Sequence, residues 1–320
     1  MAVVLAPIDG SVRALRAVPW AARLAGPDGL VILMRAIPPQ PSYAEALLTL
    51  AGSGEEGVER IQNEWTTVAN DDMDEAAALI AETGVPIDRQ ILEGDPEEAI
   101  VAAAIENAVD IVAMSSHGRG AIGRAIFGSV ADRVVRISPV PVLVLRTPED
   151  EAPEDPPVRR IIVPLDGSEL AEHALPVAAD VARNLAVPVH VVRAVDPAAN
   201  LPVTRGAFGM APSITSDAME QIWTEAEADA SSTVTRGIEA LQAAGIEASG
   251  AVLHGSPFFA ISEIALPDDL LILTSHGRGG VRRWLLGSVA EKLVREAPAP
   301  VLLVPAAERD VTLTAVDTQS

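Results

Sequence analysis

Two nearly identical loops contain the residues best suited to chemistry in this chain. Residues 116–120 read Ser-His-Gly-Arg-Gly and precede Gly128-Ser129, and residues 275–279 repeat those letters before Gly287-Ser288. In both loops, nine residues separate the glycine after the histidine from the Gly-Ser pair. A helix that starts at the Gly-Ser pair would offer unpaired amides and a partial positive charge, and glycine lets an anion approach the backbone closely. The loops are therefore typical of a phosphate site, in which the serine hydroxyl either caps the helix or bonds a phosphate oxygen.

The local charge agrees with a phosphate ligand. The chain has a formal net charge of −22, yet segments 111–131 and 270–290 contain no Asp or Glu and carry the arginines Arg119, Arg124, Arg278, Arg282 and Arg283. Turns between buried strands and helices avoid acids even without a ligand, so this pattern leaves a purely structural explanation open.

The two loops belong to a repeat that covers most of the chain. The recurring segments are 5–11 as 162–168, 31–36 as 189–194, and 141–145 as 300–304. A proline stands ten residues after the Asp of each copy, Pro19 and Pro176, where it should interrupt a helix. A capping residue followed by a proline also occurs in both copies, and it predicts helices that start at Pro96 and Pro257.

Each copy alternates short apolar, β-branched runs with helical stretches, which indicates five strands connected by helices. This pattern predicts an α/β fold, with two tandem five-stranded parallel sheets of Rossmann-like type and right-handed crossovers. Asp9 and Asp166 end the first strand of each copy, and the histidine-containing loops follow the fourth strand. Both features therefore belong to the carboxyl edge of the sheet, where open parallel sheets bind ligands.

The domain organisation follows from the repeat. We expect domains at 1–147 and 158–306, an acidic proline-rich linker at 148–157, and a flexible tail at 307–320. Insertions rich in small residues follow the second strands, at about 38–57 and 197–216, and are either lids or disordered.

Two further elements are predicted from charge and apolar patterning. The acidic run 71–74 is expected to start a helix, because carboxylates are favourable in a first turn. The closing strands, 140–145 and 299–304, are apolar edges that require cover, so we expect them to pair within the chain as an intramolecular pseudo-dimer. Two chains could then associate further as a homodimer.

Composition excludes several classes of protein. The chain has no cysteine, which rules out disulfides, thiol catalysis and cysteine-based metal sites. Its negative charge argues against nucleic-acid binding, and its single lysine, Lys292, argues against a lysine-dependent P-loop. No apolar run is long enough for a membrane helix, and no basic segment precedes the first apolar stretch, so we expect a cytoplasmic protein with no signal peptide.

These residues resemble the universal stress protein family, whose ATP-binding signature is Gly-x2-Gly-x9-Gly-Ser/Thr. Gly118 and Gly277 match the second glycine, the two Gly-Ser pairs match the end, and Asp9 and Asp166 match the family's acid after the first strand. The resemblance covers nearly the whole chain as a tandem pair. It implies a sandwich domain of the adenine-nucleotide α-hydrolase-like kind that binds ATP, with Mg²⁺ entering on the phosphates and no metal ligand from the protein.

The resemblance also implies a role for each matching position. The two aspartates would bind the ribose hydroxyls, and the backbone near Ala36 and Ala194 would meet adenine. The expected ATP site comprises Pro7, Ile8, Asp9, Ala36, Met114, Ser115, His117, Gly118, Arg119, Gly128, Ser129 and Val130 in the first copy, and Pro164, Leu165, Asp166, Ala194, Leu273, Thr274, His276, Gly277, Arg278, Gly287, Ser288 and Val289 in the second.

One position departs from the family signature. The position of the signature's first glycine is occupied by Ser115 in the first copy and by Thr274 in the second. If that position needs a positive φ, Thr274 would be strained by about 1–2 kcal/mol. If only its amide is used, either side chain is harmless. The departure bears on the phosphate side of the site more than on the adenosine side.

The leading hypothesis is a stress-response regulatory protein that binds ATP and signals to an unknown protein partner. The alternatives are a nucleotide-free, dimerising interaction module of the same fold and a slow ATPase. Asp9 and Asp166 could also be acids that only cap the fold at strand ends. Residues 118–123 match the dinucleotide pattern Gly-x-Gly-x-x-Gly, but they follow the fourth strand and not the first, which disfavours an NAD site. His117 and His276 lack nearby partners at ligand spacing, which favours a scaffold role over catalysis or metal binding.

Overall fold

The structure is a computed structural model, and it describes residues 1–38, 54–117, 128–147, 157–196, 216–275 and 286–305. The first copy contains β1 (Val3–Ile8), α1 (Val12–Leu15), α2 (Ala17–Ala25), β2 (Leu30–Ile37), α4 (Gly54–Leu79), η1 (Ala81–Thr83), β3 (Ile87–Glu93), α5 (Pro96–Glu106), β4 (Ile111–His117), α6 (Ser129–Ile137) and β5 (Val142–Thr147).

The second copy repeats this order. It contains β6 (Arg160–Pro164), α7 (Glu169–Glu172), α8 (Ala174–Leu185), β7 (Val189–Val195), α9 (Ser216–Ala243), β8 (Ala248–His254), α10 (Pro257–Ile264), β9 (Asp269–Thr274), α11 (Ser288–Glu296) and β10 (Val301–Val304). The alternation of strands and helices predicted for each copy, and with it the α/β fold class, is confirmed.

The strands form one ten-stranded sheet in the order β3-β2-β1-β4-β5-β10-β9-β6-β7-β8. Within each copy all neighbouring strands are parallel. The chain runs outward from β1 to β3 and then returns to β4 on the other side of β1, so the strand order reverses between β1 and β4. The same reversal lies between β6 and β9. These are the switch points at which ligands bind in open parallel sheets.

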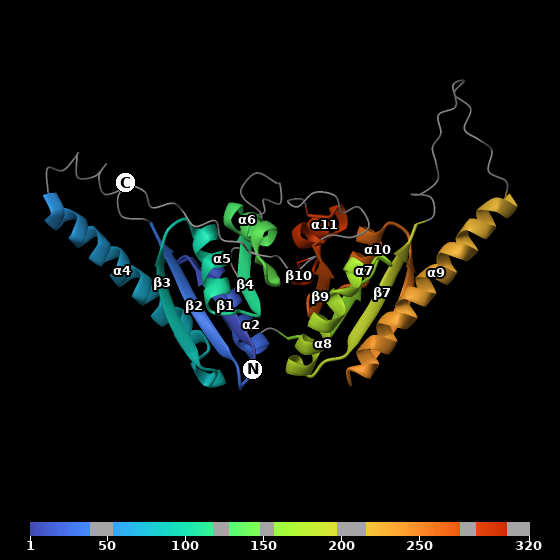
Figure 1. The fold of residues 1–320 in the computed structure, drawn as a ribbon, viewed down its shortest axis with the longest axis horizontal. Coiled ribbons are helices and arrows are strands. Elements are labelled where there is room, and N and C mark those ends of the chain that lie inside the picture. The colour runs from blue at the N-terminus through green and yellow to red at the C-terminus, as the bar shows by residue number, and fades with distance from the viewer. Residues whose placement is uncertain (39–53, 118–127, 148–156, 197–215, 276–285, 306–320) are drawn as a thin grey trace, which may run out of the picture.

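The two copies join through their last strands. β5 and β10 pair antiparallel, with Val144 opposite Val301 and Leu143 opposite Leu302. The predicted pairing of the closing strands is therefore confirmed, and Figure 1 shows the two halves meeting at this seam. The seam covers the apolar edges that each half would otherwise expose.

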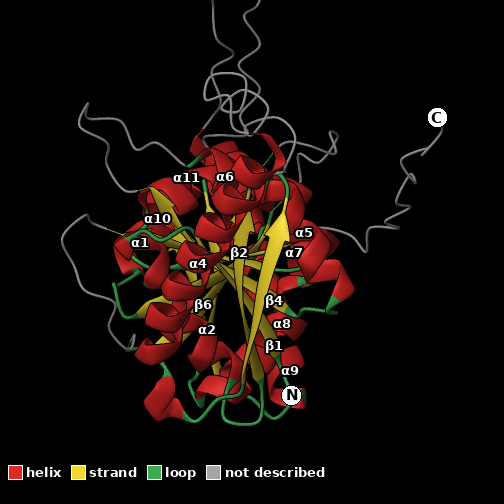
Figure 2. Cartoon of the chain, turned by 90° about the vertical axis from the view of Figure 1, so that its left-hand side faces the viewer, coloured by secondary structure: helices red, strands yellow, loops and turns green. Residues whose placement is uncertain are grey.

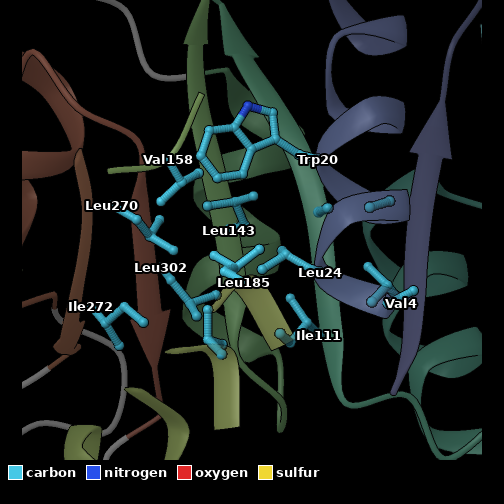
Figure 3. Packing of buried hydrophobic residues seen from close by; sticks show 14 of the residues in the cluster. Val4, Trp20, Leu24, Ile111, Leu143, Val158, Leu185, Leu270, Ile272 and Leu302 are labelled. Atoms are coloured by element: carbon cyan, nitrogen blue, oxygen red, sulfur yellow. The ribbon is translucent and has the colours of Figure 1, made fainter. Parts of the chain in front are cut away.

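Helices cover both faces of the sheet (Figure 2). One apolar core contains residues of α2, α4, α8 and α9, and the other contains residues of α5, α6, α10 and α11. Both cores include residues from both copies. In Figure 3 the indole of Trp20 lies against Val158 and Leu143, with Leu24 and Leu185 close by. The hydrophobic interior is thus continuous across the seam.

The prolines interrupt the first helix of each copy as predicted. α1 ends at Leu15, four residues before Pro19, and α7 ends at Glu172, four residues before Pro176. A proline lacks the N–H that would bond the carbonyl four residues earlier, and its ring crowds that carbonyl. α5 and α10 begin at Pro96 and Pro257, as predicted, although neither preceding residue makes a side-chain capping bond.

The prediction that residues 71–74 start a helix was wrong. They lie inside α4, which begins at Gly54, within the predicted insertion 38–57. Asp72 pairs with Arg35 and Asp74 pairs with Arg89, so arginines of the sheet neutralise these carboxylates in place of a helix dipole. The rest of that insertion, most of the second one, the linker and the tail lie outside the described residues.

Within the described ranges, no helix combines the length and the apolar character needed to cross a membrane.

Candidate functional site

The candidate site of each copy forms where two neighbouring strands end. β1 and β4 are adjacent and parallel, with Val4 opposite Ile111, and β6 and β9 repeat the arrangement. Their carboxyl ends therefore lie at the same edge of the sheet. Asp9 directly follows β1, whereas Ser115 and Ser116 are among the last residues of β4.

The aspartate after the first strand has a defined orientation in both copies. Asp9 Oδ1 accepts hydrogen bonds from the Ser11 amide (3.0 Å) and from Ser11 Oγ (2.5 Å). Ser11 Oγ in turn accepts from the Ala14 amide and so caps α1. Gly10, which lies between Asp9 and Ser11, has a φ of +77°, a conformation that residues other than glycine disfavour. One carboxylate oxygen therefore does stabilise the local fold, as the capping alternative predicted.

The second copy repeats this geometry. Asp166 Oδ1 accepts from the Ser168 amide (2.9 Å) and Ser168 Oγ (2.6 Å), and Ser168 caps α7. Gly167 has a φ of +85°. The chain thus builds the same oriented carboxylate twice, once at each switch point.

An ion pair lies next to residues 9–11, the turn after β1 that we call the Asp9 loop. Arg35 Nε lies 3.1 Å from Asp72 Oδ2, and the two side chains are 23% and 16% exposed. A Cβ added to Gly10 would lie 2.7 Å from the same carboxylate oxygen. Asp72 therefore packs against the Asp9 loop, and Gly10 is required there by contact as well as by its φ.

The counterpart of Arg35 has different partners. Arg193 is nearly buried and donates to the Asp229 carboxylate, the Asp229 carbonyl and Thr233 Oγ1. Sequence reasoning missed both arginines. The signal was present, because the Arg-Ala pairs 35–36 and 193–194 recur at the end of the second strand, but their helix partners are not at matching positions.

Ser115 and Thr274 occupy the position of the family's first glycine without backbone strain. Among the described residues other than glycine, only Ala108 and Ala186 have a positive φ. The condition under which Thr274 would be strained, a positive φ, is therefore not met, because both residues are in extended strand conformation. Ser115 Oγ donates to the carbonyl of Arg13 at 2.6 Å, which ties the end of β4 to α1.

The helices α6 and α11 start at Ser129 and Ser288, where the Gly-Ser pairs predicted them. The N-cap residues are the glycines, Gly128 and Gly287, so the idea that the serines cap these helices was wrong. A serine at the first helical position follows the N-cap, and its hydroxyl cannot take the capping role. Both serines are exposed.

Each of these helices has an acid in its first turn that is already paired. Asp132 pairs with Arg136, and Glu291 pairs with Arg295 four residues later. The pKa of Arg136 lies above its ordinary value because its hydrogen bond to Asp132, together with the charges of Asp132 and Glu291, outweighs burial. The paired acids leave the helix N-terminus able to attract an external anion.

The structure places the described site residues at the two switch points. Pro7, Ile8, Ala36 and Met114 lie at or near strand ends of the first copy, and Pro164, Leu165, Ala194 and Leu273 lie at the same places in the second. Val130 and Val289 lie in the first turns of α6 and α11. Gly118, Arg119, His276, Gly277 and Arg278 lie outside the described residues, as does the side chain of His117.

Comparison with known proteins identifies the family. The model of the universal stress protein family matches residues 1–146 and again 157–305, and the chain therefore belongs to this family. A universal stress protein of Mycobacterium tuberculosis is 29% identical over 199 residues, which cover 62% of this chain and 63% of that relative. Another from the same organism is 26% identical over 307 residues and covers 92% of both chains.

The fold has a counterpart among solved structures. The crystal structure of a universal stress protein from Archaeoglobus fulgidus matches with a TM-score of 0.61 at 20% identity, over 95% of this chain and 98% of that one. At this identity the likeness concerns the fold. It extends over both copies of the repeat.

Proposed function

We propose that this protein binds an adenine nucleotide, ATP with Mg²⁺, at the carboxyl edge of each copy and acts as a stress-response regulator. The observation that carries the proposal is the recurrence of one pair of features at both switch points. An oriented carboxylate, Asp9 or Asp166, follows the first strand, and a glycine-capped helix begins after the fourth. Membership of the family and the agreement of the loop with its signature support the same function.

The chemistry of the two features divides the nucleotide between them. A carboxylate is an acceptor only, so Asp9 and Asp166 would bind the ribose hydroxyls, which are donors. The unpaired amides at the starts of α6 and α11, together with the helix dipole, would bind phosphate oxygens. Mg²⁺ would offset the remaining phosphate charge when the nucleotide is bound. In such a strongly acidic chain, a cation that accompanies the phosphates reduces repulsion from the protein.

Calorimetry on the full chain with Mg²⁺ and ATP tests this proposal. Denaturation and chromatography of the purified protein first show whether nucleotide is already bound. The expected stoichiometry is two nucleotides per chain. Asp9→Asn and Asp166→Asn remove one acceptor charge each with little change of shape, and each should abolish one binding event. Asp28→Asn is the matched control, because Asp28 is exposed in the turn before β2 at the opposite edge of the sheet.

The outcome distinguishes the candidate functions. No heat at high protein concentration, combined with no nucleotide released on denaturation, would reject ATP binding and favour the nucleotide-free interaction module. That module is the second candidate because Ser115 and Thr274 replace the family's first glycine. Steady release of phosphate that disappears in Asp9→Asn with Asp166→Asn would instead indicate the slow ATPase.

A further inference from the structure

β8 is the outermost strand of the second copy, and in the described part of the sheet it pairs with β7 alone. At one end of β8, the Val189 amide donates to the carbonyl of Glu247 at 2.9 Å. At the other end, the Gly255 amide donates to the carbonyl of Val195 at 2.9 Å. Successive residues of a strand direct their backbone groups to alternate sides, so the odd-numbered residues of β8 bond to β7. The residues whose N–H and C=O groups point away from the sheet are therefore Ala248, Gly250, Val252 and His254.

The corresponding strand of the first copy has a charged edge. Ile91 of β3 lies beside Arg35, and Val252 of β8 lies beside Arg193, so the repeat makes β3 and β8 counterparts. β8 contains no Asp, Glu, Lys or Arg, whereas β3 has three exposed charged residues, Asp88, Arg89 and Glu93. Charged side chains on an edge strand oppose pairing with a further strand. The second copy lacks this protection, and its edge is therefore able to accept another strand.

The side chains of the outward-directed residues lie on the face of the sheet that α9 covers. A Cβ added to Gly250 would lie 2.5 Å from Cγ1 of Val234 on α9, and residues two apart in a strand share a face. His254 agrees, because its ring centroid lies 6.1 Å from that of Trp223 and its Nε2 lies 3.8 Å from Glu227 Oε1. The His254 and Glu227 side chains are 56% and 55% exposed. An aromatic ring and a carboxylate, both attractive to a cation, thus lie at one end of the edge.

The charge around this edge indicates the kind of strand that it fits. α9 lies at the outer end of the second copy (Figure 1), and it contains six Asp or Glu residues and one Arg. The whole chain has 45 acids against 23 Lys and Arg, a formal net charge of −22. A second copy of the chain would bring the same negative charge to the edge and be repelled, whereas a basic segment would be attracted.

We propose that the outer edge of β8 is a docking site for an extended, basic segment of a partner protein. The segment adds one strand to the sheet, so that its main chain bonds to the outward N–H and C=O groups of β8. Residues directly opposite each other on paired strands share a face, so a Lys or Arg opposite His254 lies close to Trp223 and Glu227. The inference goes beyond nucleotide binding and does not depend on it.

Fluorescence anisotropy with a labelled peptide, Lys-Val-Lys-Val-Lys-Val-Lys, tests the proposal on the full chain without nucleotide. The control peptide has proline at its central position, which keeps the charge but prevents strand pairing. We expect the control peptide to bind about tenfold more weakly, the equivalent of one or two lost hydrogen bonds.

Two proline variants locate the peptide on the sheet. Val252→Pro removes an outward N–H and leaves the ladder between β7 and β8 intact, so it should weaken peptide binding about tenfold. Ile91→Pro is the matched control, because it removes the corresponding outward N–H of β3 and should leave the affinity unchanged. Thermal melts establish that both variants are folded.

A second pair of variants tests the basic character of the segment. Glu227→Gln should weaken peptide binding about threefold, as expected for one exposed charge pair. Glu239→Gln makes the same change at an exposed position of α9 twelve residues further along, and it should have no effect. Equal effects of the two variants would show that the peptide responds to the overall charge and not to the end of β8.

Amide hydrogen exchange of the unmodified chain keeps the proposal testable if Val252→Pro does not fold. Saturating peptide should slow exchange of the four outward amides of β8 about tenfold and leave those of β3 unchanged. Unchanged exchange in β8, equal binding of the two peptides, or full affinity in a folded Val252→Pro chain would each reject the docking site.

Two further results would assign the edge to another occupant and overturn the proposal. One is a dimer in sedimentation velocity that Val252→Pro abolishes, which would place a second copy of the chain on β8. The other is protection of the outward amides without peptide that is lost when residues 307–320 are deleted, which would place the end of the same chain there.

Discussion

Leu143 of β5 lies directly opposite Leu302 of β10 in the antiparallel ladder that joins the two copies, and both side chains are fully buried. The pair marks the centre of a core that neither copy completes alone, because the same apolar cluster contains residues from both. The seam is thus part of the hydrophobic interior, and the stability of one copy depends on contacts made with the other.

Leu143→Ala should destabilise the whole chain and not one half of it. Truncation of a buried leucine leaves a cavity and costs about 2–5 kcal/mol. Because the core crosses the seam, thermal unfolding should remain a single transition at a lower temperature. Val12→Ala is the control, since Val12 is 57% exposed and its truncation should be nearly neutral. Two separated transitions, with only one shifted by the mutation, would show that the copies unfold independently.

Asp269 should be the acid whose protonation matters most in the second copy. Its side chain is fully buried and accepts from Arg160 at 2.9 and 3.1 Å and from the Leu266 amide at 2.9 Å. Burial alone would raise the pKa of Asp269, but these hydrogen bonds and the charges of Arg160 and Arg159 outweigh it and hold the pKa below its ordinary value. Asp269→Asn leaves Arg160 without its counter-charge and should cost about 3–5 kcal/mol at neutral pH.

The pH dependence follows from the lowered pKa. The stabilisation from ionised Asp269 is present above the pKa of an unfolded aspartate, about 3.9, and is lost as the pH falls through the lower pKa of the folded state. Urea unfolding at pH 7 and below pH 4 should therefore show a smaller acid loss in Asp269→Asn than in the unmodified chain. Asp180→Asn is the control, because Asp180 pairs with Arg183 at the surface and is 77% exposed. An equal acid loss in all three proteins would contradict the assignment.

The sequence predicts those features that depend on local pattern or on apolar edges. Strand and helix alternation follows from short apolar runs, and the helix breaks follow from the missing N–H of Pro19 and Pro176. The pairing of β5 with β10 follows because an apolar edge strand must be covered. The first two features are decided by local chemistry alone, and for the third the repeat supplies the distant partner, because both copies end in the same kind of apolar strand.

The features that sequence reasoning missed depend on partners far apart in the chain. The side chain of Arg146 donates a hydrogen bond to the carbonyl of Ala297, which is 151 residues away in the sequence. This hydrogen bond forms only once the seam between the two copies is in place. The acidic run 71–74 was misjudged because tertiary ion pairs replaced the helix dipole as the neutralising charge. The φ of residue 115 could not be predicted from the signature, because the glycine that the signature has at this position is compatible with either sign of φ, whereas serine favours a negative φ.

Ala186→Gly should stabilise the protein. Ala186 follows α8 as its C-cap with a φ of 53°, a left-handed conformation in which its Cβ is crowded. Glycine avoids that crowding and is the usual residue at this position, so a gain of about 0.5–1 kcal/mol is expected. Ala182→Gly is the contrast, because Ala182 lies inside the same helix and glycine there should destabilise by about 1 kcal/mol. Thermal melts that rank the two variants in the opposite order would contradict the role of the φ at residue 186.

Ser115→Gly restores the family's glycine, yet it should not improve the first nucleotide site. The serine is unstrained, and its Oγ holds β4 to the Arg13 carbonyl at 2.6 Å, close to the Asp9 loop. Loss of this hydrogen bond should cost about 1 kcal/mol, and glycine in a strand adds about 0.5–1 kcal/mol. Ser115→Ala separates the two effects, because it removes the bond but keeps the Cβ. Calorimetry with ATP and Mg²⁺ should show unchanged or weaker binding in both variants, and a gain of about tenfold, or 1.4 kcal/mol, in Ser115→Gly would mean that the hydroxyl obstructs the phosphate.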